Sequence, residues 1–381
     1  MRPYLKRFSS VLLCAGFIST ILFSTFTGSA FAQKEKKELI QMAILLDTSN
    51  SMDGLINQAK SQLWKIVNEL AIAKRNGKSP SIEVALYEYG NSGLSSQDGY
   101  IRKVLPLTGD LDTVSEKLFS LSTNGGDEYC GQVIESAVKN LGWSQNKDTY
   151  KVIFIAGNEP FTQGKVDYVK SCKNAISKGI IVNTIFCGNY KEGVDTKWKD
   201  GADLADGKYV NIDQNQEIAY IEAPQDKEIA KLGAELNKTY IAYGTAGREK
   251  KEKQAKQDMN AASVSAEAVV QRSVAKASGQ YNNASWDVVD ATERGNVDIE
   301  KLKDDELPAE MKGLTGKERK EYVDKLVKKR AEVQKKINAL NEDRRKYVES
   351  EMKKQSKDNT LDAAIIKTVR DQAEKKEFKF K

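Results

Sequence analysis

Short apolar runs alternate with amphipathic stretches between Leu39 and about Tyr243. Apolar runs without polar alternation are typical of strands that are covered on both faces of a sheet. Strands that alternate with helical stretches predict a largely parallel sheet, so we expect one doubly wound α/β domain over residues 38–245. The predicted strands are Leu39–Asp47, Ile82–Tyr89, Tyr100–Leu107, Val152–Ala156, Ile180–Phe186 and Lys208–Ile212, and the predicted helices are Leu55–Ala73, Gln132–Leu141, Val166–Ser177 and Asp226–Leu236.

The composition changes after Gly247. Residues 246–280 are rich in charge, Ala and Ser and predict a solvated helix or linker, and residues 281–381 predict a mainly helical C-terminal region. Thr315 and Glu318 match a capping box, so a long helix should run from about Gly316 to Lys354.

Apolar residues of this long helix fit the a and d positions of a coiled coil. However, Arg330 and Arg344 occupy a positions, where a charge weakens a dimeric seam. A coiled coil and a helix packed against its own chain therefore both remain open. A final helix should follow Thr360, with its apolar residues on one face.

The N-terminal segment has the pattern of a secretory signal peptide over residues 1–32. Arg2, Lys6 and Arg7 precede a mostly apolar stretch from Phe8 to Phe26, and Ala30-Phe31-Ala32 gives a small-x-small cleavage pattern. We expect cleavage near Ala32 and a periplasmic or otherwise exported chain, with an uncleaved anchor as the alternative.

Charge and histidine content exclude several classes of function. The 381 residues carry 60 Lys and Arg against 54 Asp and Glu, an excess too small to predict a nucleic-acid-binding face. The chain has no histidine, so Ser-His-Asp and Cys-His catalytic arrangements and zinc sites with a His ligand are impossible. We therefore expect a protein that is not an enzyme.

One motif offers metal-ligand chemistry. The apolar strand that ends at Asp47 runs directly into Ser49 and Ser51, giving Asp-x-Ser-x-Ser at the carboxyl end of a strand. Ligands bind at this edge of open α/β sheets. Carboxylate and hydroxyl oxygens suit Mg²⁺, with Mn²⁺ or Ca²⁺ as alternatives. Ser49 or Ser51 could instead cap a helix without any ion.

From Leu39 to about Tyr243 the sequence resembles a von Willebrand factor A (VWA) domain, because Asp47, Ser49 and Ser51 match the first loop of its metal-ion-dependent adhesion site (MIDAS). The resemblance implies five parallel strands and one antiparallel edge strand, with Mg²⁺ or a similar ion at the top. It also implies that a partner protein supplies a carboxylate to the ion. The whole chain resembles secreted bacterial proteins of this type with no assigned activity.

Two loops depart from the family pattern. The second loop usually supplies a Thr after a glycine pair, whereas here Asp127 and Glu128 follow Gly125-Gly126, with Glu128 at the Thr position. The Asp of the third loop is replaced by Asn158, which is followed by Glu159. We expect Asp127 or Glu128 to compensate for the lost charge and Asn158 and Glu159 to line the rim. A degenerate site that holds no metal is the alternative.

Three cysteines follow the N-terminal segment: Cys130, Cys172 and Cys187. In an oxidising compartment, one disulfide and one free thiol are the simplest arrangement. In a VWA fold Cys130 and Cys187 would lie near the same edge of the sheet, which favours a bridge between them. Cys172 would be a buried apolar residue within a helix.

These features predict an exported, non-enzymatic protein that binds a protein partner through a MIDAS-like cation site. We expect a membrane only as a neighbouring part of the cell envelope and not as a binding partner. The sequence leaves the oligomeric state open. The alternative is an envelope scaffold that assembles through its helical tail while the VWA site holds no metal.

Overall fold

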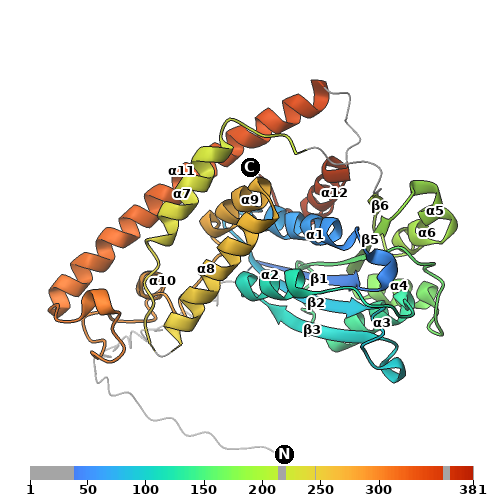
Figure 1. Cartoon of the computed structure of the whole chain (residues 1–381), viewed down its shortest axis with the longest axis horizontal. Helices are drawn as coiled ribbons and strands as arrows, with labels where there is room; N and C mark the ends of the chain where they lie inside the picture. The colour runs from blue at the N-terminus through green and yellow to red at the C-terminus, as the bar shows by residue number, and fades with distance from the viewer. Residues whose placement is uncertain (1–37, 213–219, 245, 355–360, 381) are drawn as a thin grey trace, which may run out of the picture. The chain divides into compact units, whose positions relative to one another are not determined.

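The computed structural model describes residues 38–212, 220–244, 246–354 and 361–380 (Figure 1). The predicted signal peptide and its cleavage point lie outside these residues. Residues 37–381 form one compact unit. No helix in the described ranges has the length and apolar character needed to cross a membrane.

A six-stranded sheet forms the centre of the fold, in the order β3-β2-β1-β4-β5-β6. All neighbouring pairs are parallel except β2 and β3, which confirms the predicted sheet with one antiparallel edge. The central strands β1 and β4 are buried almost throughout, because helices cover both of their faces. The strands are β1 (Leu39–Asp47), β2 (Ser81–Tyr89), β3 (Ile101–Thr108), β4 (Tyr150–Gly157), β5 (Ile180–Cys187) and β6 (Tyr209–Ile212).

Helices form a layer on each side of the sheet (Figure 1). Leu63 and Leu118 belong to the apolar core of one face, and Ile134 and Trp198 belong to the core of the other face. The first layer contains α1 (Ile56–Ala71), α2 (Leu111–Ser120) and α12 (Leu361–Glu374); the second contains α3 (Cys130–Asn140), α4 (Tyr168–Ser177) and α6 (Trp198–Asp203), with α5 (Tyr190–Asp195) at the end of β5.

The C-terminal helix α12 completes the core of the sheet domain. Ile365 and Val369 are buried in the same apolar cluster as β1 and α1. Gln372 Oε1 accepts hydrogen bonds from the Tyr150 hydroxyl at 2.9 Å and from Asn183 Nδ2 at 3.0 Å. The domain therefore draws on two separate stretches of sequence, 38–212 and 361–380, whereas the hydrophobic pattern predicted one continuous stretch.

The intervening residues form helices that pack on one another. Thr315 and Glu318 make the predicted capping box, and α11 has the predicted bounds. The long helix packs along α7 and α9 of its own chain (Figure 1), which is the second of the two open alternatives. These helices are α7 (Asp226–Asn237), α8 (Gly247–Val264), α9 (Ala266–Ala277), α10 (Val288–Glu293) and α11 (Gly316–Lys354).

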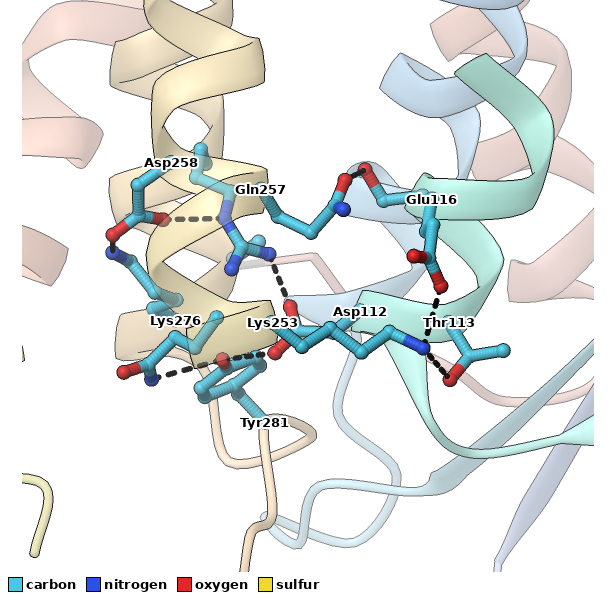
Figure 2. A network of polar contacts seen from close by, with 12 residues as sticks. Asp112, Thr113, Glu116, Lys253, Gln257, Asp258, Lys276 and Tyr281 are labelled. Carbon is cyan, nitrogen blue, oxygen red and sulfur yellow. Dashed lines mark hydrogen bonds and ion pairs between the residues drawn. The ribbon is translucent and has the colours of Figure 1, made fainter. Parts of the chain in front are cut away.

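A buried polar network joins α8 and α9 to α2 of the sheet domain (Figure 2). Arg272 bridges Asp258 on α8, at 2.7 Å, and Asp112 on α2, at 2.5 Å. Lys276 donates to the second oxygen of Asp258 at 2.6 Å, and the Tyr281 hydroxyl donates to Asp112 at 2.6 Å. Paired charges rather than apolar side chains thus connect the helical region to the sheet domain here.

Candidate metal centre

The loops that follow β1 and β4 meet at the carboxyl edge of the sheet. Asp47 ends β1, Ser51 lies in the following turn, and Asn158 follows β4. Ser51 Oγ donates to Asn158 Oδ1 at 2.8 Å, and Asn158 Nδ2 donates to the Ser51 carbonyl at 2.9 Å. Because β1 and β4 are parallel neighbours, their ends bring these polar residues together, as the family resemblance implied.

Asp47 holds an unpaired buried oxygen. Its side chain is fully buried, and Oδ1 accepts the backbone N–H of Ser49 at 2.8 Å. Oδ2 has no hydrogen-bond partner among the described residues. Burial raises the pKa of the Asp47 carboxyl to about 7, although Ser49 and the nearby backbone N–H of Asn158 oppose the shift. A buried anionic oxygen without a donor calls for a proton or a cation.

The serines are not helix caps. Ser49 Oγ and Ser51 Oγ lie 2.7 Å apart, so the two hydroxyls share one hydrogen bond. Ser49 precedes the short 3-10 turn Asn50–Met52 but its side chain makes no capping bond, and the residue before α1 is Leu55. The capping alternative is therefore not what the structure shows, and the hydroxyl oxygens are placed beside Asp47.

Of the two acids in the second loop, Glu128 faces the site and Asp127 does not. Glu128 is buried, and its pKa is raised to about 7 by burial and then by the charges of Asp47 and Glu159. Asp127 is exposed, and its carboxylate accepts the Tyr129 hydroxyl at 3.1 Å. Of the two acids, Glu128 is therefore the one placed beside Asp47, whereas Asp127 belongs to the outer surface.

Two glycines allow these carboxylates to approach the backbone. Neither glycine is among the site residues predicted from the sequence. A Cβ at Gly157 would lie 2.9 Å from Asp47 Oδ2 and 2.5 Å from the Tyr89 hydroxyl. Gly90 has φ +78°, and a Cβ there would lie 2.8 Å from Asp47 Oδ1 and 2.9 Å from Glu128 Cγ. In the sequence, these two glycines are marked only by their position directly after a predicted strand.

Asn158 and Glu159 are half-buried at the rim, where the third loop was expected to place them. The Glu159 carbonyl accepts the indole N–H of Trp198 at 2.8 Å, which anchors this loop to α6. The negative charge of Glu159 contributes to the raised pKa values of both Asp47 and Glu128. The rim therefore adds negative charge and no basic group of its own.

This donor set fits a hard divalent cation. Two buried carboxylates, the hydroxyls of Ser49 and Ser51 and the amide oxygen of Asn158 are all oxygen donors, which Mg²⁺ and Ca²⁺ prefer. Across the described ranges, no three Asp, Glu or Cys side chains come together as a metal-binding group. A cation here would thus depend on Asp47 and Glu128 together with neutral oxygens and water.

The predicted disulfide between Cys130 and Cys187 is not formed. All three cysteines are free and buried. Cys130 belongs to the apolar cluster on the α3 face of the sheet, whereas Cys187 belongs to the cluster on the α1 face, so the sheet separates them. Burial raises the pKa of each thiol, which leaves Cys130 unsuited to act as a nucleophile. Cys172 is the buried helical residue that was expected.

Comparisons with known proteins agree with this fold. Residues 41–201 match the family model of the von Willebrand factor type A domain. A search of curated proteins finds no match.

Several solved structures are similar to the chain. BatB from Bacteroides thetaiotaomicron is 19% identical, with 46% of this chain and 90% of that chain covered and a TM-score of 0.35. An aerotolerance-related membrane protein from Bacteroides fragilis is 18% identical, with 46% and 92% covered and a TM-score of 0.33. Proximal thread matrix protein 1 from the mussel byssus, solved with a zinc-occupied MIDAS motif, is 10% identical, with 47% and 43% covered and a TM-score of 0.34.

Proposed function

We propose that this chain, in which residues 41–201 form a von Willebrand factor type A domain, is a binding protein that contacts a protein partner through a divalent cation. Asp47 and Glu128 would hold the cation together with the hydroxyls of Ser49 and Ser51. The bound ion would supply a positive centre that accepts an oxygen from the partner, and the family resemblance implies a carboxylate for that role. Asn158 and Glu159 would line the contact.

One observation carries the proposal. Asp47 Oδ2 is buried without a hydrogen-bond donor, and a second buried carboxylate, Glu128, faces the same site. Burial is the main reason that both pKa values are raised to about 7, and the charge of Asp47 adds to the shift of Glu128. A divalent cation would neutralise the pair and provide the missing partner for the orphan oxygen.

We also propose that the protein is exported and that it is not an enzyme. It is supported by the signal-peptide pattern over residues 1–32 and by the absence of histidine from the sequence. The scaffold alternative, in which the tail assembles chains and the VWA site is empty, has less support. Arg330 and Arg344, the charges at the a positions of α11, both pair with acids of their own chain.

Calorimetric titration of residues 33–381 with Mg²⁺, Mn²⁺ and Ca²⁺ tests the cation site. We expect one ion per chain in the wild type and loss of binding in Asp47→Asn, which keeps the shape of the side chain. Asp127→Asn is the matched control, because Asp127 is an exposed acid of the neighbouring loop. It should leave the affinity within about threefold. Wild-type protein that binds none of the three ions would support the scaffold alternative.

The open position on the ion can be tested without knowledge of the natural partner. With Mn²⁺ bound, the longitudinal relaxation of water protons reports water molecules on the metal. We expect acetate, as a simple carboxylate, to lower this relaxation enhancement, and acetamide to lower it less. No response to acetate would contradict a partner carboxylate while leaving the ion site itself intact.

A further inference from the structure

Basic residues gather at the opposite, amino-terminal edge of the sheet. Strands β1, β2, β4 and β5 are parallel, so the loops before them meet at one edge. Lys74 and Lys78 lie in the loop before β2, Lys147 lies before β4, and Lys178 lies before β5. The end of α12 adds further lysines. We call the following residues the basic edge: Lys74, Arg75, Lys78, Lys147, Lys151, Lys178, Lys376 and Lys379.

Direct contacts show that the basic edge is continuous. The backbones of Lys74 and Lys379 exchange two hydrogen bonds, at 2.8 and 2.7 Å. Lys376 Nζ donates to the Lys147 carbonyl at 2.9 Å. Further links run from Arg75 to Lys78, through a backbone pair, and from Lys151 Nζ to the Lys178 carbonyl. These residues come from four separate segments of the chain, 74–78, 147–151, 178 and 376–379, so the fold and not a single basic run creates the surface.

The basic edge keeps a clear excess of positive charge. The acids in contact with it are Glu38 and Glu377, which both pair with Arg75, and Asp148, whose carbonyl accepts from Arg75. Among the described residues, eight basic residues thus lie beside these three acidic ones, in a protein whose formal net charge is only +6. Five of the lysines are exposed: Lys74, Lys78, Lys147, Lys178 and Lys379.

The charge distribution reverses at the carboxyl edge. Residues 44–59, 79–101, 118–138 and 152–164 contain no Lys or Arg, although they include the loops around Asp47 and Glu128. β1 has nine residues, so the two edges are roughly 26 Å apart. This separation exceeds the Debye length of about 8 Å in physiological salt, so each edge acts on its own partner.

We propose that the basic edge is a docking surface for an anionic phospholipid bilayer. Clustered Lys and Arg side chains bind the negative surface of such a bilayer, and each residue near the surface adds to the affinity. The described chain begins at this same edge, at Glu38, and 37 residues precede it in the sequence. They include the apolar stretch from Phe8 to Phe26, which is typical of a segment that targets a chain to a membrane.

Binding in this way would turn the candidate metal centre away from the membrane. Glu38 lies at the start of β1 and Asp47 at its end, so a bilayer at one edge leaves the other edge open to a partner. The inference does not rest on the proposed cation site, because none of the residues of the basic edge belongs to that site.

Cosedimentation with vesicles tests the proposal, using residues 33–381, which contain the compact unit. Vesicles of phosphatidylcholine alone are compared with vesicles that contain about 30 mol% phosphatidylglycerol. We expect binding only to the anionic vesicles, and release in about 0.5 M NaCl, where the Debye length falls to a few ångströms. Equal binding to both kinds of vesicle, or none to either, would overturn the proposal.

Charge-reversal variants test whether this particular surface is responsible. Lys74→Glu, Lys147→Glu and Lys178→Glu together change three exposed lysines whose side chains form no ion pair with any residue in the described ranges. We expect the partition coefficient to fall about tenfold or more. Lys325→Glu, Lys328→Glu and Lys335→Glu on the exposed face of α11 give the same change in net charge and should cost about threefold or less. Equal losses would show that only net charge matters and would overturn the assignment.

A control titration with a soluble headgroup distinguishes binding to a bilayer from binding to a small anion. Glycerol phosphate at the same total headgroup concentration should not bind measurably in calorimetry, because the basic edge is a spread surface and not an enclosed pocket. Tight, stoichiometric binding of glycerol phosphate would contradict the bilayer as the occupant.

Discussion

Arg330 Nη1 of α11 donates to Asp287 Oδ2 at 2.6 Å, and both side chains are buried. The same guanidinium lies 4.1 Å from the centroid of the Tyr240 ring and donates to the Thr239 hydroxyl at 3.0 Å. An acid, an aromatic ring and a hydroxyl of its own chain therefore hold the guanidinium in place. This explains how a charged residue can occupy a core position of a long amphipathic helix.

We expect Arg330→Met to lower the free energy of unfolding by about 3 to 5 kcal/mol. The cost comes from Asp287, which would stay buried without its partner, and not from the lost attraction alone. Urea unfolding measures the change. Lys328→Met, an exposed position two residues away, should cost less than about 0.5 kcal/mol. Combining Arg330→Met with Asp287→Asn should recover part of the loss; no recovery would argue against the unpaired charge as the cause.

Features that depend on neighbouring residues could be predicted from the sequence. The strand before Asp47 and the serines after it are covalently adjacent, so the first loop of the site followed from the motif. The capping box of Thr315 and Glu318 is equally local. The structure confirms the capping box, and it places Asp47 at the end of β1 with Ser49 and Ser51 beside it.

Features that depend on loop conformation or on distant contacts could not be predicted. Asp127 and Glu128 are adjacent, and only the path of the loop decides which of them turns inward. Cys187 points to one face of the sheet and Cys130 approaches the other, a difference set by the alternation of side chains along β5. The packing of α12 against α1 joins residues about 300 positions apart, such as Arg370 and Glu69, and no periodicity reports such a contact.

The stability of the protein in chelator should fall as the pH rises from about 4 to 7. The pKa values of Asp47 and Glu128 are raised in the folded state, so folding favours their protonated forms. This contribution is complete below the unfolded pKa values near 4 and is lost as the pH passes about 7. For Asp47 the shift corresponds to about 4 kcal/mol at most. The measurement is the free energy of unfolding from urea titrations in EDTA.

Asp47→Asn should flatten this pH dependence, whereas the exposed Asp127→Asn should leave it unchanged. Mg²⁺ binds the ionised carboxylates, so the increase in melting temperature that it causes should be larger at pH 8 than at pH 5.5. A melting temperature that is independent of Mg²⁺ at both pH values would contradict the assignment of a cation site.

Gly157→Ala should weaken cation binding and lower stability, because its Cβ would press on Asp47 Oδ2 and the Tyr89 hydroxyl. We expect a loss of about 1 to 3 kcal/mol in the free energy of unfolding, typical of an overpacked buried site. Gly142→Ala is the matched control, since no atom lies within 4 Å of the position its Cβ would take. Equal effects of the two substitutions would show that the close approach at Gly157 is not the cause.

Lys276 should make the protein more stable as the pH rises from about 8 to 10. Burial, together with the charge of Arg272, lowers the pKa of Lys276 to about 8, whereas in the unfolded chain it lies near 10.5. Between these values the unfolded chain binds more protons, so the free energy of unfolding rises with pH, by about 3 kcal/mol at most. Urea unfolding of the wild type and of Lys276→Met isolates this contribution as the difference in slope. Parallel slopes would mean that Lys276 keeps its proton through its contact with Asp258.

The cysteines should be unreactive in the folded protein and fully reactive once it unfolds. Each thiol is buried, and burial raises the pKa of Cys172 to about 12, so almost no thiolate forms at neutral pH. Iodoacetamide at pH 8, followed by mass spectrometry of residues 33–381, should add no label to the native protein. The same treatment in guanidinium chloride without a reducing agent should add three labels. A single label in guanidinium, rising to three after reduction, would instead show the bridge that the sequence predicted and would place Cys130 and Cys187 within reach of each other during folding.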